Sequence, residues 1–207
     1  MNELDKVLDK NEKVFWDGKP KFWPFVLTGI IAIQIIGLFF LIPSIIFIII
    51  VFSTSNTEIA NLGFAVFLFP QLWIGVFLVF GPLIYKTLLH KRIHYAITNK
   101  RVILQKGLIG RDFEMVDFDQ ITNAEVNVGI IDKLFGNGSG SILISTAGTF
   151  TYGRRGIAHK PYIISNVGNP YEVFKFFKKV SHAVKTDINF PNKFRPKTNP
   201  GYDTDYK

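Results

Sequence analysis

The chain has 207 residues, of which 48% are hydrophobic and 15% aromatic, and its formal net charge is +8 at pH 7. It contains no cysteine, which excludes disulfide bonds, thiolate catalysis and cysteine-ligated metals. The basic excess lies after residue 85, where 19 Lys and Arg residues face 10 Asp and Glu residues, whereas residues 1–21 carry five of each sign. A basic segment of this kind suits a negatively charged neighbour, such as an anionic lipid surface or an acidic partner.

Residues 1–21 form an N-terminal arm of mixed apolar and charged character. The arm is too long and too acidic for the first region of a signal peptide, and the apolar stretch that follows is about twice the length of a signal core. We therefore expect it to remain attached to the protein. Trp16, Phe22 and Trp23 have the amphipathic rings that settle at a membrane–water interface, although Trp16 suits a domain core equally well.

Two apolar stretches follow the arm, at about residues 25–52 and 59–85, and neither contains Lys, Arg, Asp or Glu. A helix needs roughly 20 apolar residues to cross a bilayer core of ~30 Å, and both stretches exceed that length. Residues 22–85 are thus predicted to form a transmembrane helical hairpin, joined by the polar turn 53–58. The alternative is a pair of buried helices in a soluble core. Pro43 and Pro70 are expected to kink the spans or mark their ends.

The basic residues near the span ends predict the orientation of this hairpin. The turn between the spans has no Lys or Arg, the arm has five lysines, and Lys86, Lys91 and Arg92 follow the second span closely. We expect an integral protein of the cell membrane with two spans and both termini in the cytoplasm.

From residue 93 the pattern changes to alternation of apolar and polar residues, which indicates strands. The expected strands number about seven and lie at 93–98, 101–105, 112–117, 123–128, 141–146, 150–152 and 162–167. The turn Thr98–Arg101 predicts a hairpin between the first two, and residues 129–140 are expected to form a loop. The longer segment Tyr152–Pro161 is also expected to be a loop.

A helix is predicted after the last strand. Asn169 is a good N-cap, Pro170 suits the first turn, and Glu172 stands three residues after the cap. The apolar stripe consists of Val173, Phe177, Val180 and Val184. Beyond it, residues 186–207 lack periodicity and are expected to be disordered.

Several motifs resemble one family, the bacterial pleckstrin-homology (PH)-like domain proteins with flanking membrane helices, a family of unknown function. The matching segments are Glu12–Phe15, Gly18–Pro20, His94–Ile103, Gly107–Ile109, Val116–Val126, Asp132–Gly138 and Ser141–Thr146, so the resemblance spans about residues 11–185. It implies an α+β membrane protein in which residues 86–185 form a cytoplasmic PH-like antiparallel β-barrel with a C-terminal capping helix. Leu134 and Phe135 would insert beneath the barrel, and Gly107, Gly136 and Gly138 would permit positive φ at sharp turns.

Basic residues are the candidate contacts for lipid head groups or a partner protein. They are Lys86, Lys91, Arg92, Arg154, Arg155 and Lys160. The first three also serve as topology signals, and the last three also suit a plain solvated loop. His90 and His94 are four residues apart, but no third ligand is near and no metal is expected. No catalytic set or nucleotide-binding motif is present; we therefore expect no enzyme activity, no cofactor and no nucleic-acid partner.

Two functions remain open on these grounds. The first is a membrane-anchored, non-enzymatic binding or scaffold module on the cytoplasmic face, which contacts anionic lipid or a partner protein. A homo-oligomer is a further candidate partner. The alternative function is an accessory subunit of a transport or envelope-assembly complex, with contacts made by small residues of the spans. Those residues are Gly29, Gly37, Gly63 and Gly75.

Overall fold

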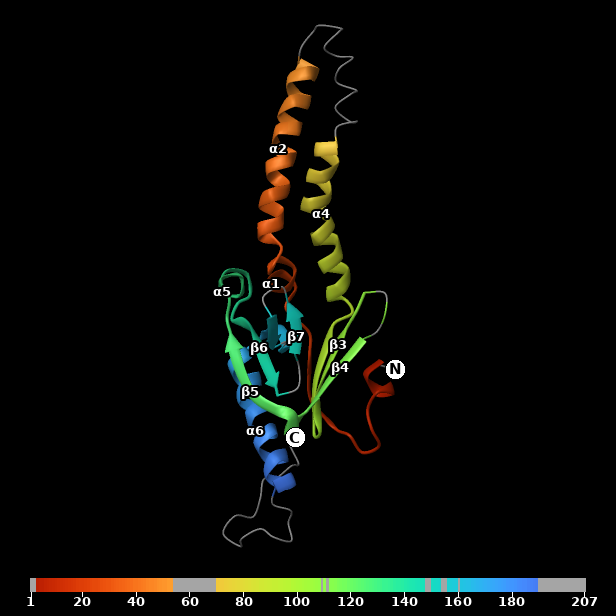
Figure 1. Cartoon of the computed structure of the whole chain (residues 1–207), viewed down its shortest axis with the longest axis vertical. Coiled ribbons are helices and arrows are strands. Elements are labelled where there is room, and N and C mark those ends of the chain that lie inside the picture. The colour runs from red at the N-terminus through yellow and green to blue at the C-terminus, as the bar shows by residue number, and fades with distance from the viewer. Residues whose placement is uncertain are drawn as a thin grey trace. The chain divides into compact units, whose positions relative to one another are not determined.

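The computed structural model describes residues 3–53, 70–108, 110, 112–147, 150–153, 156–159 and 161–189. The chain divides into two units (Figure 1). The sheet unit combines Met1–Phe25 with Leu89–Lys207, and the helical unit is Val26–Leu88. The N-terminal arm and the residues after the second apolar stretch therefore belong to one unit.

The helical unit is built from two long apolar helices. Helix α1 spans Phe22–Leu27, α2 spans Ile31–Ser53 and α4 spans Pro70–His90. The first predicted span is interrupted between α1 and α2, where Gly29 takes the left-handed φ of 83° that favours glycine. Pro43 lies inside α2, Pro70 is the first residue of α4, and Pro82 lies inside α4. Residues 54–69, including the predicted turn and the start of the second span, lie outside the described residues.

Two glycines let α2 and α4 approach each other closely. A Cβ atom on Gly37 would lie 2.9 Å from the Cβ of Leu78, and one on Gly75 would lie 2.9 Å from the backbone nitrogen of Leu41. The contacts move backward along α4 as they move forward along α2, so the two helices are antiparallel. Both helices are long and apolar enough to cross a membrane by length and composition.

The sheet unit contains two main antiparallel sheets and a separate hairpin. The four-stranded sheet has the order β1 (Val14–Gly18), β2 (His94–Thr98), β3 (Arg101–Lys106) and β4 (Asp112–Asp117). The three-stranded sheet has the order β5 (Ile121–Asn127), β6 (Ser139–Thr146) and β9 (Tyr162–Gly168). Strands β7 (Phe150–Gly153) and β8 (Gly156–His159) pair only with each other in the described part of the chain.

This arrangement corrects the expected closed barrel of about seven strands. Nine strands are described, because β1 and β8 were not predicted, and they hydrogen-bond in separate sheets that do not close. The chain leaves the first sheet after β4 through the short 3-10 helix η2 (Phe118–Gln120) before β5 starts the second sheet. Tyr95 on β2 hydrogen-bonds with Ser165 on β9 and so ties the two sheets together, while burial raises the pKa of the Tyr95 hydroxyl.

The predicted hairpin between the first two strands is confirmed. Strands β2 and β3 pair with His94 opposite Gln105 and Ile97 opposite Val102. The Thr98 hydroxyl accepts hydrogen bonds from the backbone nitrogens of Lys100 (3.1 Å) and Arg101 (3.0 Å), which holds the turn.

The C-terminal helix α6 (Pro170–Asn189) packs against the sheets, as the apolar stripe predicted. It contacts η2, β5 and β6 (Figure 1), and the ring of Phe177 lies 6.0 Å from that of Phe118. The stripe ends on Ala183, which is fully buried, whereas the predicted Val184 is half-buried. Asn169 takes a φ of 48° and not the extended backbone usual for an N-cap. The helix continues past the predicted end, and residues 190–207 lie outside the described residues.

Candidate functional site

The structure separates the six basic residues predicted to contact lipid or a partner. Lys86 is half-buried within α4 in the helical unit. Lys91 and Arg92 are exposed and directly follow α4 in the sheet unit. Arg154, Arg155 and Lys160 lie outside the described residues.

The expected loop Tyr152–Pro161 is strand over most of its described residues, because β7 ends at Gly153 and β8 spans Gly156–His159. Gly153 and Gly156 pair as the last partners of the β7–β8 hairpin, so the extra length of this segment forms a second strand. The alternating pattern of Gly156–His159 is too short for a reliable strand prediction without its partner.

His90 lies where the chain re-enters the sheet unit, and it bonds to the segment by which the chain leaves that unit. Its Nε2 donates a hydrogen bond to the carbonyl oxygen of Pro20 over 2.8 Å. Its ring lies 5.2 Å from that of Phe22 and 5.9 Å from that of Phe25. This engagement gives His90 a structural role, and the described residues contain no group of three or more His, Cys, Asp or Glu that could hold a metal ion.

Lys21 connects the same point to a distant loop of the sheet unit. Its Nζ donates to the carbonyl oxygens of Gly136 (2.9 Å) and Asn137 (3.3 Å). Its backbone nitrogen donates to the carbonyl oxygen of Asn166 on β9 over 2.7 Å. From the sequence, Lys21 counts only as one of the basic residues that set the topology, and no local pattern indicates that it contacts residues more than a hundred positions away.

The loop that Lys21 holds follows a short helix, α5 (Ile130–Phe135), at a place where the sequence predicted only a loop. The carboxylate of Asp132 fastens this helix to strands β6 and β9. It is buried, and it accepts hydrogen bonds from Gly129 N (3.1 Å), Ser139 Oγ (2.6 Å) and Asn166 Nδ2 (2.9 Å). Because a buried carboxylate is stable only when its oxygens are satisfied, these donors determine which side of α5 faces inward.

Gly136 ends α5 for a reason other than the expected positive φ. Its φ is −100°, but a Cβ atom there would collide with Ser139 Oγ and with the carbonyl oxygen of Asp132. Gly107 and Gly138 do take the expected positive φ, at 111° and 79°. Glycine is thus required at position 136 by space and at the other two positions by backbone conformation.

The apolar residues of α5 point away from the protein. Ile130 is 76% exposed, Leu134 is 68% exposed and Phe135 is 53% exposed. The expectation that Leu134 and Phe135 insert beneath a barrel is therefore wrong, because the inward side of the helix is already occupied by the Asp132 hydrogen bonds.

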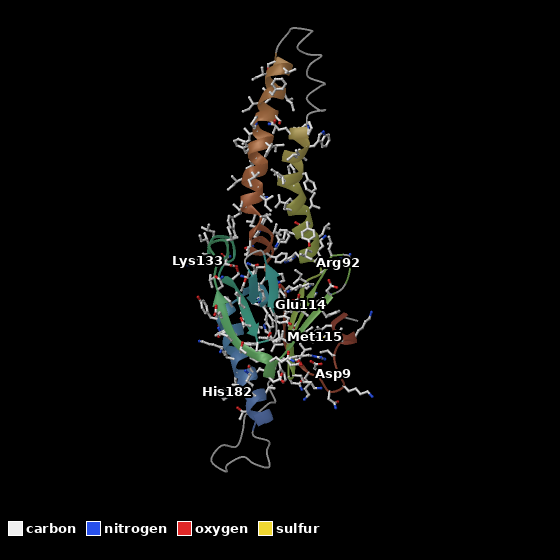
Figure 2. All side chains as sticks on the ribbon, in the orientation of Figure 1. Asp9, Arg92, Glu114, Met115, Lys133 and His182 are labelled. Atoms are coloured by element: carbon white, nitrogen blue, oxygen red, sulfur yellow. The ribbon has the colours of Figure 1, made fainter. Side chains whose placement is uncertain are left out.

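We call the surface formed by Lys21–Trp23, Lys91, Arg92 and α5 the junction face. Figure 2 shows Lys133 of α5 and Arg92 at one end of the sheet unit, and Asp9 and His182 at the other. Lys91, Arg92 and Lys133 are exposed, as are the rings of Phe22 and Trp23. The junction face thus combines basic groups with exposed apolar groups where the chain passes to and from the apolar helices.

A second cluster of charged residues lies at the opposite end of the sheet unit, and its members bond to one another within the fold. The buried carboxylate of Glu12 accepts from Arg101 Nη2 (2.8 Å), Arg101 Nε (3.1 Å), Thr98 Oγ1 (2.7 Å) and Asp9 N (2.9 Å). Burial alone would raise the pKa of Glu12, but these hydrogen bonds and the Arg101 charge outweigh it, so the pKa lies below its usual value. The cluster fastens the N-terminal arm to the β2–β3 hairpin and leaves no free carboxylate oxygen for chemistry.

Two apolar antiparallel helices inserted into a two-sheet unit with a C-terminal helix define a PH-like module with a helical hairpin. A family model described as "Bacterial PH domain" matches residues 24–171, a range that includes both apolar helices and all strands from β2 to β9. The chain belongs to the bacterial PH domain family. No curated protein and no solved structure matches the chain significantly.

Proposed function

We propose that this protein is a membrane-anchored PH-domain binding module of the cell membrane. The helical unit crosses the bilayer twice, both termini lie in the cytoplasm, and the sheet unit binds anionic lipid head groups through basic residues of the junction face. The observation that carries the proposal is the exposed apolar surface of the helical hairpin.

The low burial of both helices supports the membrane assignment, because the core helices of a soluble protein are mostly buried. Phe39 on α2 is 75% exposed and Phe77 on α4 is 72% exposed, although the two helices pack against each other through glycines. Exposing this much contiguous apolar surface to water is unfavourable by about 25 cal/mol per Å², and lipid removes that penalty. Both backbones are helical, as the bilayer core requires.

The role of β1 supports an anchor over a removed leader. Asp17 on β1 pairs with Ala96 on β2, and Glu12 is bonded to Arg101. Cleavage after α2 would remove a strand of the four-stranded sheet and leave the Arg101 guanidinium without its main partner.

Lipid binding is supported by the location of the exposed charges. Lys91 and Arg92 come directly after α4, so a bilayer crossed by α4 would lie close to both. Anionic lipid attracts each nearby Lys or Arg by ~1 kcal/mol, and the attraction decays over a Debye length of ~8 Å. Arg154, Arg155 and Lys160 remain part of the proposal on sequence grounds. We propose a binding role and no enzyme activity, in keeping with the general use of PH domains as binding modules.

Labelling of single introduced cysteines tests the membrane topology. The chain has no native cysteine, so the label reacts with this protein only at the introduced position. Asn56→Cys and Lys175→Cys variants are treated with a membrane-impermeant maleimide in intact and in permeabilised cells. We expect label at position 56 in intact cells and at position 175 only after permeabilisation. The reverse pattern, or equal labelling of both in intact cells, would refute the proposed orientation.

Lipid retention tests the binding role. The full chain is reconstituted in nanodiscs of phosphatidylcholine with phosphatidylglycerol, extracted in mild detergent, and its bound lipids are counted by native mass spectrometry. We expect selective retention of phosphatidylglycerol, which falls in Lys91→Gln/Arg92→Gln but not in Lys10→Gln/Lys175→Gln, a control with the same change in charge. Equal retention in both variants would overturn the lipid role and favour a partner protein.

The alternative, an accessory subunit that binds its complex through glycines of the spans, loses part of its support. Gly37 and Gly75 are occupied by the contact between α2 and α4, and Gly29 lies in the break before α2. Gly63 is outside the described residues. A monomer in mild detergent would argue further against this alternative.

A further inference from the structure

We propose that α5 inserts Ile130, Leu134 and Phe135 into the interface of the bilayer, as a third membrane contact that does not span it. The inference rests on the proposed membrane anchoring and adds to it a contact between the sheet unit and the lipid surface. The partner is the lipid surface itself, and the contact is apolar.

The outward side of α5 is apolar and carries no negative charge. Ile130 and Leu134 are four residues apart, so they share one side of the helix, and Phe135 extends that side. The only carboxylate of the helix, Asp132, is buried and bonded to Ser139 and Asn166, so no negative charge is presented outward. Lys133 is exposed beside the apolar group and suits the head-group region.

Exposed apolar residues of the sheet unit are concentrated on α5 and at Phe22–Trp23. Among its described residues, seven large apolar side chains are exposed, and five of them lie on α5 or at Phe22–Trp23. The two others are Val14 and Tyr171. Scattered single residues of this kind need no explanation, but a cluster does.

Hydrogen bonds also link the loop after α5 to the point where the chain approaches the apolar helices. Lys21 Nζ is bonded to the carbonyl oxygens of Gly136 and Asn137, which directly follow α5, and the next residues of the chain are Phe22 and Trp23. An exposed Trp at the start of an apolar segment marks the membrane interface. Lys21 therefore links the loop after α5 to the residues just before Trp23, so a lipid surface that Trp23 meets would lie near α5 as well.

A bilayer fits this surface better than a second copy of the chain does. Stable protein interfaces bury about 800 Å² on each partner and need a complementary shape. Helix α5 has six residues and offers three apolar side chains, which is too little for such an interface. A lipid interface requires no matching surface, and a small apolar group adds to an anchor that already exists.

Depth-dependent fluorescence quenching tests the inference on the full chain. Single cysteines at Leu134→Cys, His182→Cys and Phe77→Cys are labelled with bimane, and the protein is placed in nanodiscs of phosphatidylcholine that carries a nitroxide on its acyl chain. Position 134 reports on α5, position 182 on the far end of the sheet unit (Figure 2) and position 77 on α4. We expect strong quenching at positions 77 and 134 and little at position 182. Neutral lipid is used so that the result does not depend on the basic residues.

The outcomes separate this inference from the proposed function. Quenching at position 77 without quenching at 134 would overturn the insertion of α5 alone, and a blue shift at position 134 that grows with protein concentration would assign the surface to a second copy. Absence of quenching at position 77 would overturn the membrane anchoring as well. A second variant keeps the test specific: Ile130→Asp should reduce quenching at 134 severalfold, whereas Ile130→Met should leave it unchanged. Since Ile130 is largely exposed, both should fold like the parent.

Discussion

Replacing Glu12 with Gln should destabilise the sheet unit far more than the same substitution at Glu114, whose carboxylate is only half-buried. The Glu12 side chain is 0% exposed and forms a two-point pair with Arg101, at 2.8 Å and 3.1 Å. The amide of Gln would place an NH₂ group either against Arg101 Nη2 and Asp9 N or, when flipped, against Arg101 Nε, so a donor would face a donor in both orientations. The guanidinium would also lose its main counter-charge.

The structure supplies the magnitude. Removing one partner of a buried pair costs about 3–5 kcal/mol. Arg101 is still 17% exposed and Asp9 Oδ2 remains 3.4 Å from its Nη2, so some compensation persists. We therefore expect the lower end, about 3 kcal/mol, which lowers the melting temperature of a unit of this size by roughly 10 °C. Strand β1 should loosen first, because Glu12 lies two residues before it and fastens this part of the arm to Arg101.

Glu114 provides the matched control, since it makes a 2.7 Å pair with Lys106 in which the two side chains are 28% and 33% exposed. Glu114→Gln should cost at most about 1 kcal/mol. Thermal unfolding of the full chain in mild detergent measures both variants, and hydrogen exchange reports on β1 and β2. If Glu12→Gln and Glu114→Gln shift the melting temperature equally, Glu12 does not fasten the arm, and the reasoning fails.

Three further predictions follow from the same contacts. The pKa of Glu12 is lowered in the folded state, so the stability that its ionised carboxylate contributes is complete above the usual pKa of about 4.5 and is lost as the pH falls through the folded pKa. Acid unfolding curves should therefore show that the parent loses stability with falling pH more steeply than Glu12→Gln does. Burial and the Lys19 charge lower the pKa of His94, with Asp17 opposing, so stability should decline as the pH drops below about 6.5, and His94→Gln should remove that decline in the same curves. Gly75→Ala should destabilise the helical hairpin by about 1–3 kcal/mol, because its Cβ would press on the α2 backbone. Gly81→Ala is the control, since its Cβ would meet only the Phe77 ring at 3.5 Å or more, and equal heat-induced aggregation of the two in detergent would contradict the packing.

The elements that sequence reasoning identified correctly are those with a strong local signal. The apolar helices are indicated by uninterrupted runs of apolar residues without charge, and α6 is indicated by a stripe of apolar residues at helical spacing. The β2–β3 hairpin carries both alternation and turn residues within a dozen positions. Each of these signals depends on residues close together in the sequence, where the backbone geometry alone sets the spacing.

The residues of the candidate site could be predicted from the sequence only in part. Lys91 and Arg92 could be selected because they follow the second apolar stretch, but the sequence could not show that Lys21 reaches Gly136 and Asn137. A lysine beside a membrane segment has the same local pattern whether it is solvated or bonded to a distant loop.

By itself, then, the sequence determined the apolar hairpin, most of the strands, the final helix and the bacterial PH-like family. Tertiary structure alone decided that the arm pairs with β2, with Asp17 opposite Ala96, that the sheets stay open, and that α5 faces outward. The physical reason is that a run such as Leu134–Phe135 is equally apolar in a core or against lipid. Its direction is set by the buried Asp132 and the groups that satisfy it, which come from strands further along the chain.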